Sequence, residues 1–132
     1  MTIDDLKMVQ TYKYAIRSIE DTIERLRSEM ERATQTLSHA PAHTEGRDKL
    51  AYQVQRMLEL ETARAREVAD MEEHIDRCRV WLCTIPEQQA KILQLRYMDG
   101  LKWEEVAEKS GYDKRYCHKI HNAAMVRLIG RG

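Results

Sequence analysis

The stretch Lys102–Ile120, KWEEVAEKSGYDKRYCHKI, decides how the C-terminal part of this chain folds. Its first part has the residue pattern of a short helix over 102–110, and Gly111 then offers the left-handed conformation that ends a helix. Asp113 is a good N-cap for the next helix, which the pattern extends over 113–128. Two short helices joined by a glycine-containing turn predict a helix-turn-helix unit.

The last of these helices is predicted to have one buried and one exposed face. Cys117, Ile120, Ala124 and Leu128 recur at the spacing of a buried face. The opposite face of the first turns is then cationic, and in a helix-turn-helix this part enters the major groove, where basic side chains meet phosphates and guanine edges. Tyr116 is expected either to contact the DNA backbone or to pack on the protein. The predicted DNA-binding residues are Lys114, Arg115, Tyr116, His118, Lys119 and Asn122.

The charge distribution agrees with this prediction. The 132 residues include 22 Lys and Arg and 22 Asp and Glu, so the formal net charge is zero. Acidic residues outnumber basic ones over residues 1–84, whereas basic residues dominate residues 113–132, where Asp113 is the one acidic residue. A positive segment beside an acidic part of the chain is typical of a small nucleic-acid-binding module.

Residues 1–84 are predicted to form a long antiparallel helical hairpin. Two seams of mainly apolar residues alternate at spacings of three and four, which is the heptad pattern of a coiled coil. Between them the stretch 38–48, with Pro41 and Gly46, interrupts the helix. The two seams are Val9, Tyr12, Ile16, Ile19, Ile23, Leu26, Met30, Ala33 and Leu37, followed by Leu50, Val54, Met57, Glu61, Arg64, Val68, Met71, Ile75, Cys78 and Leu82.

The expected fold is therefore all-α, with a hairpin domain over 1–84 and a helix-turn-helix domain over 85–132. A two-helix hairpin buries only one stripe of each helix, so we expect further cover from the C-terminal domain or from a second copy of the chain. A homodimer through the hairpin is predicted. The polar layer at Glu61 and Arg64 would then set the register or the partner.

A further short helix is predicted to begin at Pro86 and to end at Met98, because proline suits the first helical position and Gly100 suits the C-terminal cap. The features from residue 85 to residue 128 that carry a family resemblance are Ile85-Pro86-Glu87, Leu95-Arg96-Tyr97, Asp99-Gly100-Leu101, Glu105-Val106-Ala107-Glu108, Gly111, Ile120, Ala124 and Leu128. Through them this part of the chain resembles region 4 of sigma-70-type RNA polymerase sigma factors.

The whole chain further resembles a family of small phage and prophage proteins of Gram-positive bacteria. Those proteins join a helical N-terminal part to a region-4-like end with the motifs Trp-Glu-Glu and Gly-Tyr, here Trp103-Glu104-Glu105 and Gly111-Tyr112. Related proteins are regarded as late-gene or autolysin-type transcription regulators. The resemblance implies a sequence-specific, DNA-binding transcription regulator in the cytoplasm of a bacterial host cell.

In sigma region 4 the positions that read bases and contact phosphates correspond to Lys114, Arg115, His118 and Lys119. Arg115 stands where the family has an acidic reader, and His118 stands where it has an arginine. We therefore expect a target other than an ordinary −35 promoter element, with Arg115 suited to guanine. The acidic hairpin of residues 1–84 replaces the promoter-melting domain of a full sigma factor, so we expect the protein to recruit or assist RNA polymerase.

Two other classes of function fit the same sequence. The DNA-recognition (small) subunit of a phage packaging terminase would use the same helix-turn-helix and form a ring of many copies. An RNA polymerase-binding adaptor would use its region-4-like end for a protein contact.

The sequence does not predict an enzyme, a cofactor or a metal site. It lacks a Ser/His/Asp order, a phosphate-binding loop and a cluster with metal-ligand spacing. Cys78, Cys83 and Cys117 form no CxxC motif and indicate free thiols in a reducing cytoplasm. We expect no membrane association, because no apolar run is long enough to span a bilayer and the N-terminus does not look like a signal peptide.

Overall fold

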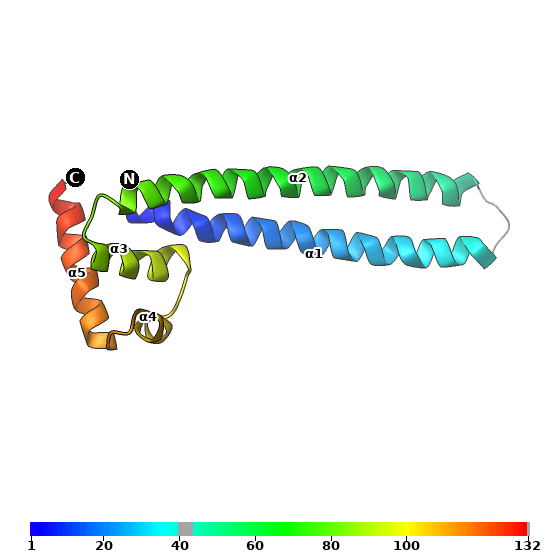
Figure 1. The fold of residues 1–132 in the computed structure, drawn as a ribbon. Helices are drawn as coiled ribbons and strands as arrows, with labels where there is room; N and C mark the ends of the chain where they lie inside the picture. Colours follow the sequence, from blue (N-terminus) through cyan, green and yellow to red (C-terminus); the bar gives the residue numbers. More distant parts are fainter. Residues whose placement is uncertain (40–43, 132) are drawn as a thin grey trace. The chain divides into compact units, whose positions relative to one another are not determined.

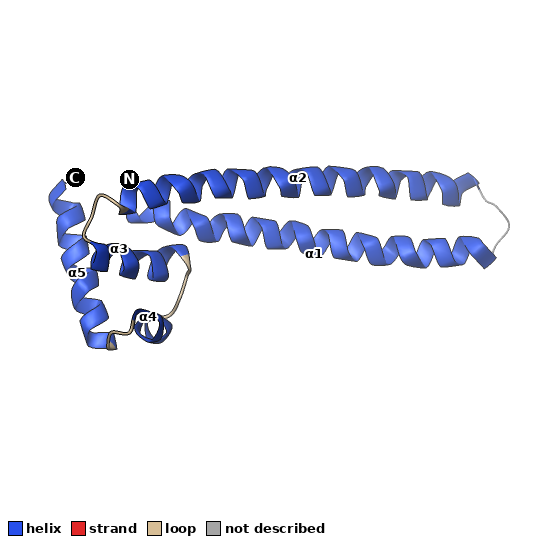
Figure 2. Ribbon diagram, in the orientation of Figure 1, coloured by secondary structure: helices blue, strands red, loops and turns tan. Residues whose placement is uncertain are grey.

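The computed structural model describes the backbone of residues 1–39 and 44–131 and the side chains of residues 1–35 and 47–128. The regular secondary structure of this part of the chain is all helical, with no strand, so the predicted all-α class is confirmed (Figures 1 and 2). The elements are α1 (Ile3–His39), α2 (Thr44–Leu82), α3 (Glu87–Leu93), the π-helical turn η1 (Gln94–Met98), α4 (Trp103–Ser110) and α5 (Lys114–Arg131).

Two predicted helix boundaries differ from those observed. The predicted bounds of the interruption, 38 and 48, are wrong, because α1 extends to His39 and α2 begins at Thr44 with Gly46 inside it, while Pro41 lies outside the described residues. Pro86 is the N-cap of α3 and not its first residue, since its ψ of 139° is extended. Because Pro86 is extended, Glu87 is the first residue with helical backbone angles.

The chain divides into two compact units. The first unit is formed by Met1–Lys13 and Met71–Gly132, and the second by Tyr14–Asp70. The division therefore falls inside the long helices α1 and α2, whereas the predicted domains 1–84 and 85–132 met at the end of α2.

The core of the first unit joins both long helices to the short ones. Leu6 of α1 and Cys78 of α2 are fully buried, and they share one cluster with Leu93 of α3 and Ala124 of α5. Burying a leucine side chain contributes about 1.5–3 kcal/mol, so this cluster binds the start of α1 to the C-terminal helices. The buried members of the cluster are Leu6, Val9, Cys78, Leu82, Ile85, Leu93, Met98 and Ala124.

A polar contact near this core connects α1 to the end of η1. The side-chain amide of Gln10 donates a hydrogen bond to the backbone carbonyl of Met98. Gly100 follows with a φ of +69°, and a Cβ atom at this position would stand 2.8 Å from the Gln10 side chain. The predicted left-handed glycine is confirmed, because this positive φ strains a residue that carries a side chain.

A second cluster in the same unit joins α3, α4 and α5. Ile92, Val106 and Cys117 are each fully buried, and Ile120 is 6% exposed. Since these four side chains come from three helices, they fix how α5 crosses α3 and α4. Partly buried apolar residues surround them, namely Leu95, Leu101, Trp103, Ala107 and Tyr112.

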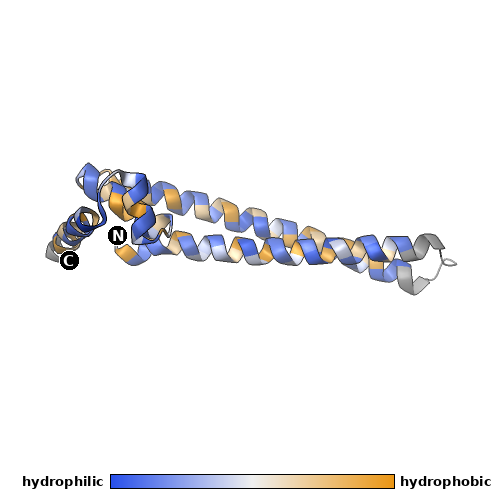
Figure 3. Ribbon diagram, turned by 90° about the horizontal axis from the view of Figure 1, so that it is seen from below, coloured by the Kyte–Doolittle hydropathy of each residue, from blue (hydrophilic) through white to orange (hydrophobic). Residues whose placement is uncertain are grey.

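In the second unit, α1 and α2 run side by side (Figure 1), and hydrophilic and hydrophobic residues alternate along them (Figure 3). The seam predicted in α1 is confirmed, because its positions from Val9 to Ala33 are all buried or half-buried, and Leu37 lies outside the described side chains. Ile16 and Ile23 are the most buried residues of α1 in this unit, at 7% exposure each.

The seam predicted in α2 is partly wrong. Val54 is 44% exposed and Glu61 is also exposed, whereas the preceding residues, Gln53 and Leu60, are buried. The buried face of this part of α2 is therefore rotated by one position. The rotation buries leucine in place of glutamate, and burying an ionised carboxylate would be far more costly.

The expected polar layer in α2 is likewise not buried. Arg64 pairs with Glu20 of α1 at 3.5 Å, and both side chains are nearly half exposed. An exposed ion pair of this kind contributes little stability. Glu61 and Arg64 therefore lie at the edge of the helix pair and not in its seam.

Candidate nucleic-acid interface

The turn between α4 and α5 has the local chemistry predicted from the sequence. Gly111 has a φ of +79°, and its N–H donates to the carbonyl of Ala107 at 3.1 Å, which ends α4. A carboxylate oxygen of Asp113 then accepts the N–H of Tyr116 at 2.7 Å, which caps the start of α5. Both predicted roles are confirmed, and together they direct α5 away from α4 within three residues.

The predicted inner face of α5 is also confirmed. Cys117 is fully buried, Ala124 is 1% exposed and Leu128 is half-buried. The Cys117 sulfur lies 3.5 Å from the Ser110 hydroxyl, which itself accepts the N–H of Tyr112 at 3.2 Å. The inner face thus holds α5 to the rest of the unit by apolar contacts and by a polar contact to the turn.

The outer face of α5 brings three predicted site residues together. Arg115, Lys119 and Asn122 are all exposed. Their spacing of four and three residues places them one above another on the same side of the helix. This side lies opposite Cys117 and Ala124, so it faces solvent. A cationic and amide-bearing strip therefore begins in the first turn of α5.

Lys114 and His118 lie on the flank of α5 that faces α4. The Lys114 ammonium donates to the Glu104 carboxylate at 2.7 Å, and both side chains are more than half exposed. This hydrogen bond holds the pKa of Glu104 below its usual value. Lys114 is therefore accessible, but it is shared with an acidic neighbour.

Tyr116 lies on the other flank. Its ring meets the edge of the Tyr112 ring at a centroid distance of 5.2 Å, and 39% of the residue remains exposed. The Tyr112 hydroxyl in turn accepts a hydrogen bond from the Gln88 amide at 3.2 Å. Tyr116 packs on the protein and keeps part of its surface free, so both predicted uses of this side chain stay open.

An aromatic and basic cluster between α4 and α5 was not predicted. The Trp103 and His118 rings have their centroids 4.1 Å apart with a tilt of 37°, and His121 approaches the same indole edge-on at 5.0 Å. The Arg96 guanidinium lies 4.9 Å from the Trp103 ring. From the sequence, Trp103 was identified only as part of the Trp-Glu-Glu motif. Its contacts with Arg96, His118 and His121 could not be predicted, because residues so far apart in the chain meet only after folding.

His121 belongs to the protein side of this cluster. It is hydrogen-bonded to the Tyr97 hydroxyl at 2.6 Å, and the Lys7 ammonium of α1 lies 5.5 Å from the Tyr97 ring. Burial lowers the pKa of His121 and raises the pKa of Tyr97. Burial therefore favours the neutral form of both groups, and the contacts of His121 are made within the protein.

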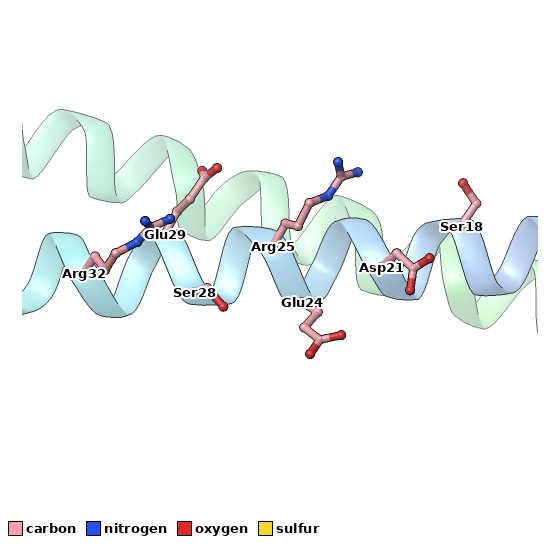
Figure 4. A pocket seen from close by; sticks show the side chains of 7 residues that line it. All are labelled: Ser18, Asp21, Glu24, Arg25, Ser28, Glu29 and Arg32. Atoms are coloured by element: carbon pink, nitrogen blue, oxygen red, sulfur yellow. The ribbon is translucent and has the colours of Figure 1, made fainter.

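The remaining surfaces of the described residues offer no comparable arrangement. A hollow in the second unit (Figure 4) is lined by α1 alone, with a mixture of acidic and basic side chains that is typical of a solvated helix face. Its lining residues are Ser18, Asp21, Glu24, Arg25, Ser28, Glu29 and Arg32.

Across residues 1–39 and 44–131, no three His, Cys, Asp or Glu side chains gather as potential metal ligands. None of the helices described there combines the length and apolar character that a membrane crossing requires. The three cysteines are free thiols.

Comparisons with protein-family models, with curated proteins and with solved structures give no match to this chain. The resemblance to sigma region 4 and to the phage regulator family therefore depends on the residues quoted in the sequence analysis.

Proposed function

We propose that the protein is a sequence-specific, DNA-binding transcription regulator of the phage or prophage type. In this proposal α3, α4 and α5 form a sigma region 4-like helix-turn-helix, and the start of α5 enters the major groove. One observation supports it most: Arg115, Lys119 and Asn122 share an exposed face of a helix whose opposite face is buried at Cys117 and Ala124. A helix braced from behind in this way can enter a groove without losing its own packing.

The chemistry of the exposed face suits base and phosphate contacts. An arginine such as Arg115 pairs with the O6 and N7 acceptors of guanine, and an asparagine such as Asn122 pairs with adenine. These two positions are seven residues apart, about 10 Å along the helix axis, which is close to the rise of three base pairs. Lys114 and Lys119 would neutralise phosphates on either side.

The long helices supply the second part of the proposal. The hairpin of α1 and α2 would serve as the oligomerisation or partner arm, giving a homodimer that binds two half-sites about one turn of DNA apart. Recruitment or assistance of host RNA polymerase, in the bacterial cytoplasm, follows from the family resemblance. Val54 and Leu58, exposed on α2, are apolar positions available to a second copy.

The proposal is tested by measuring binding to labelled duplex DNA over a range of salt concentrations. We compare the wild type with a Lys114→Ala/Arg115→Ala/Lys119→Ala variant and with a Lys13→Ala/Arg17→Ala/Arg66→Ala control. The control removes the same charge from exposed positions of the long helices. If three phosphate or base contacts are lost, the slope of log K against log salt falls in magnitude by about 2–3 in the first variant only.

Equal binding by the two variants would contradict the proposal. The mass of the protein–DNA complex separates the other functional classes in the same experiment. A ring of many copies would favour the packaging subunit. The adaptor would be favoured if the protein binds no DNA and its binding to RNA polymerase survives the Lys114/Arg115/Lys119 substitutions.

A further inference from the structure

Trp103, the first residue of α4, is in contact with basic side chains from two other elements. His118 and His121 approach it from α5, and Arg96 approaches it from η1. The indole is half-buried and packs against the second core cluster, so its position is set by the fold and not by solvent. A rigid aromatic surface therefore stands beside the flank of α5.

Arg96 is also held in place by the fold. Its guanidinium donates to the backbone carbonyl of Leu101 at 2.8 Å, just before α4 begins. The anchored guanidinium limits the movement of the Trp103 ring on one side, and the edge-on contact with His121 limits it further. The indole is therefore constrained by its neighbours before any partner binds.

The contact with His118 has a direct consequence for what that side chain can do. With the ring centroids 4.1 Å apart, one face of the imidazole is covered by Trp103. The nitrogen atoms lie on the ring edge, which a contact to the ring face does not occupy. His118 follows Arg115 by one helical turn and precedes Asn122 by another, so the residue borders the exposed strip of α5.

We propose that Trp103 is a positioning residue for base recognition, which holds the His118 imidazole in one orientation so that its edge makes a hydrogen bond to a purine in the major groove. The inference rests on the proposed function and adds a specificity-determining pair to it. An imidazole N–H matches the N7 and O6 acceptors of guanine. A free histidine side chain would have to be immobilised on binding, whereas the stacked ring is already ordered.

The expected effect follows from this ordering. Immobilising one side chain on binding weakens affinity by roughly 3- to 10-fold. Replacing Trp103 by leucine, which fills apolar space without offering a ring, should therefore weaken the preference for the best base at one position by about that factor. The loss should be confined to the base pair that also responds to His118→Ala.

The experiment measures Kd for a set of duplexes that differ at single base pairs, starting from the preferred site of the wild-type protein. The proteins are wild type, Trp103→Leu, Trp103→Phe, His118→Ala and the Trp103→Leu/His118→Ala double variant, with Lys119→Ala as a matched control for general loss of affinity. We expect Trp103→Leu and His118→Ala to relax the discrimination between bases at the same base pair. The double variant should discriminate no less and no more than His118→Ala. Trp103→Phe should keep the discrimination, because it keeps an aromatic ring.

A second measurement does not depend on whether the leucine variant folds. Stacking on an indole shifts the ring protons of His118 upfield in the proton NMR spectrum, and the shift should persist when wild-type protein binds its preferred duplex. Loss of this shift in the complex would mean that His118 leaves Trp103 to reach DNA, which overturns the inference. The inference is also overturned if a folded Trp103→Leu variant retains full discrimination between bases. It is overturned as well if this variant loses affinity equally for every duplex, as Lys119→Ala does.

The outcomes also separate this inference from the proposed function. A wild-type protein that binds duplex DNA selectively while Trp103 substitutions leave the selectivity unchanged refutes only the role of Trp103. A wild-type protein that binds no duplex refutes the proposed function and this inference together.

Discussion

Leu6 is the position at which the start of α1 supports the C-terminal helices most directly. Its side chain is fully buried and belongs to the cluster that includes Leu93 of α3 and Ala124 of α5. Replacing Leu6 by alanine removes three carbon atoms from this cluster and leaves a cavity, because close-packed neighbours relax only in part. We predict that this change in α1 destabilises α5.

The size of the effect can be worked out from the burial. A Leu→Ala substitution at a fully buried site lowers the free energy of unfolding by about 3–5 kcal/mol. For a unit of this size a loss of about 3 kcal/mol lowers Tm by on the order of 15 °C. It also lowers the hydrogen-exchange protection of amides that exchange by opening of the whole unit by about 100-fold.

Hydrogen exchange of α5 is therefore the assay, followed over residues 117–125. Met8→Ala is the matched control, because Met8 lies two residues away and is 46% exposed, so its loss should change stability by less than about 0.5 kcal/mol. If Leu6→Ala accelerates exchange in α1 and leaves residues 117–125 as protected as in the control, the stability of α5 does not depend on Leu6, and the prediction is refuted.

Three further predictions concern single substitutions. Glu104→Gln should strengthen duplex binding at low salt, because Lys114 no longer has to leave the Glu104 carboxylate to reach a phosphate, and an unchanged affinity would argue against a phosphate contact by Lys114. Leu60→Ala should lower the free energy of unfolding, measured in urea, by about 2–4 kcal/mol, whereas Glu61→Ala should have little effect. A larger loss of stability in Glu61→Ala than in Leu60→Ala would show that Glu61 lies in the seam of α2, as first predicted. Because the pKa of His121 is lowered in the folded state, the unfolded chain binds the proton more readily, so the stability of the protein should fall as the pH is lowered through about 6.5. In thermal unfolding, His121→Gln should reduce this loss of stability between pH 7 and pH 5. A variant with the same pH profile as the wild type would contradict this prediction.

The structure of α5 could be predicted from sequence because its signals are local. The spacing of Cys117, Ile120 and Ala124 identifies the buried face of one helix, and Gly111 and Asp113 end and begin helices through their own backbone and side-chain chemistry. None of these signals depends on which other helix is near. The outward position of the cationic strip follows from the same periodicity.

Two features could not be predicted because they depend on a partner far away in the chain. In α2, the spacing of three and four selected Val54 and Glu61, but the adjacent Gln53 and Leu60 are the buried residues, because the packing partner decides which stripe is buried. The stack of Trp103 on His118 requires α4 and α5 to be placed against each other before either residue gains its role. The π-helical turn η1, which carries Arg96 to the same indole, has no recognised sequence signal.

Selection of bound duplexes from a random-sequence pool, with purified protein at moderate salt, tests the central claim that the start of α5 reads DNA. The account predicts that the wild type enriches a defined motif and that Arg115→Ala loses the preference for guanine at one position of that motif while the rest is kept. A pool that stays random after repeated selection, or a motif that Arg115→Ala leaves unaltered, would contradict it.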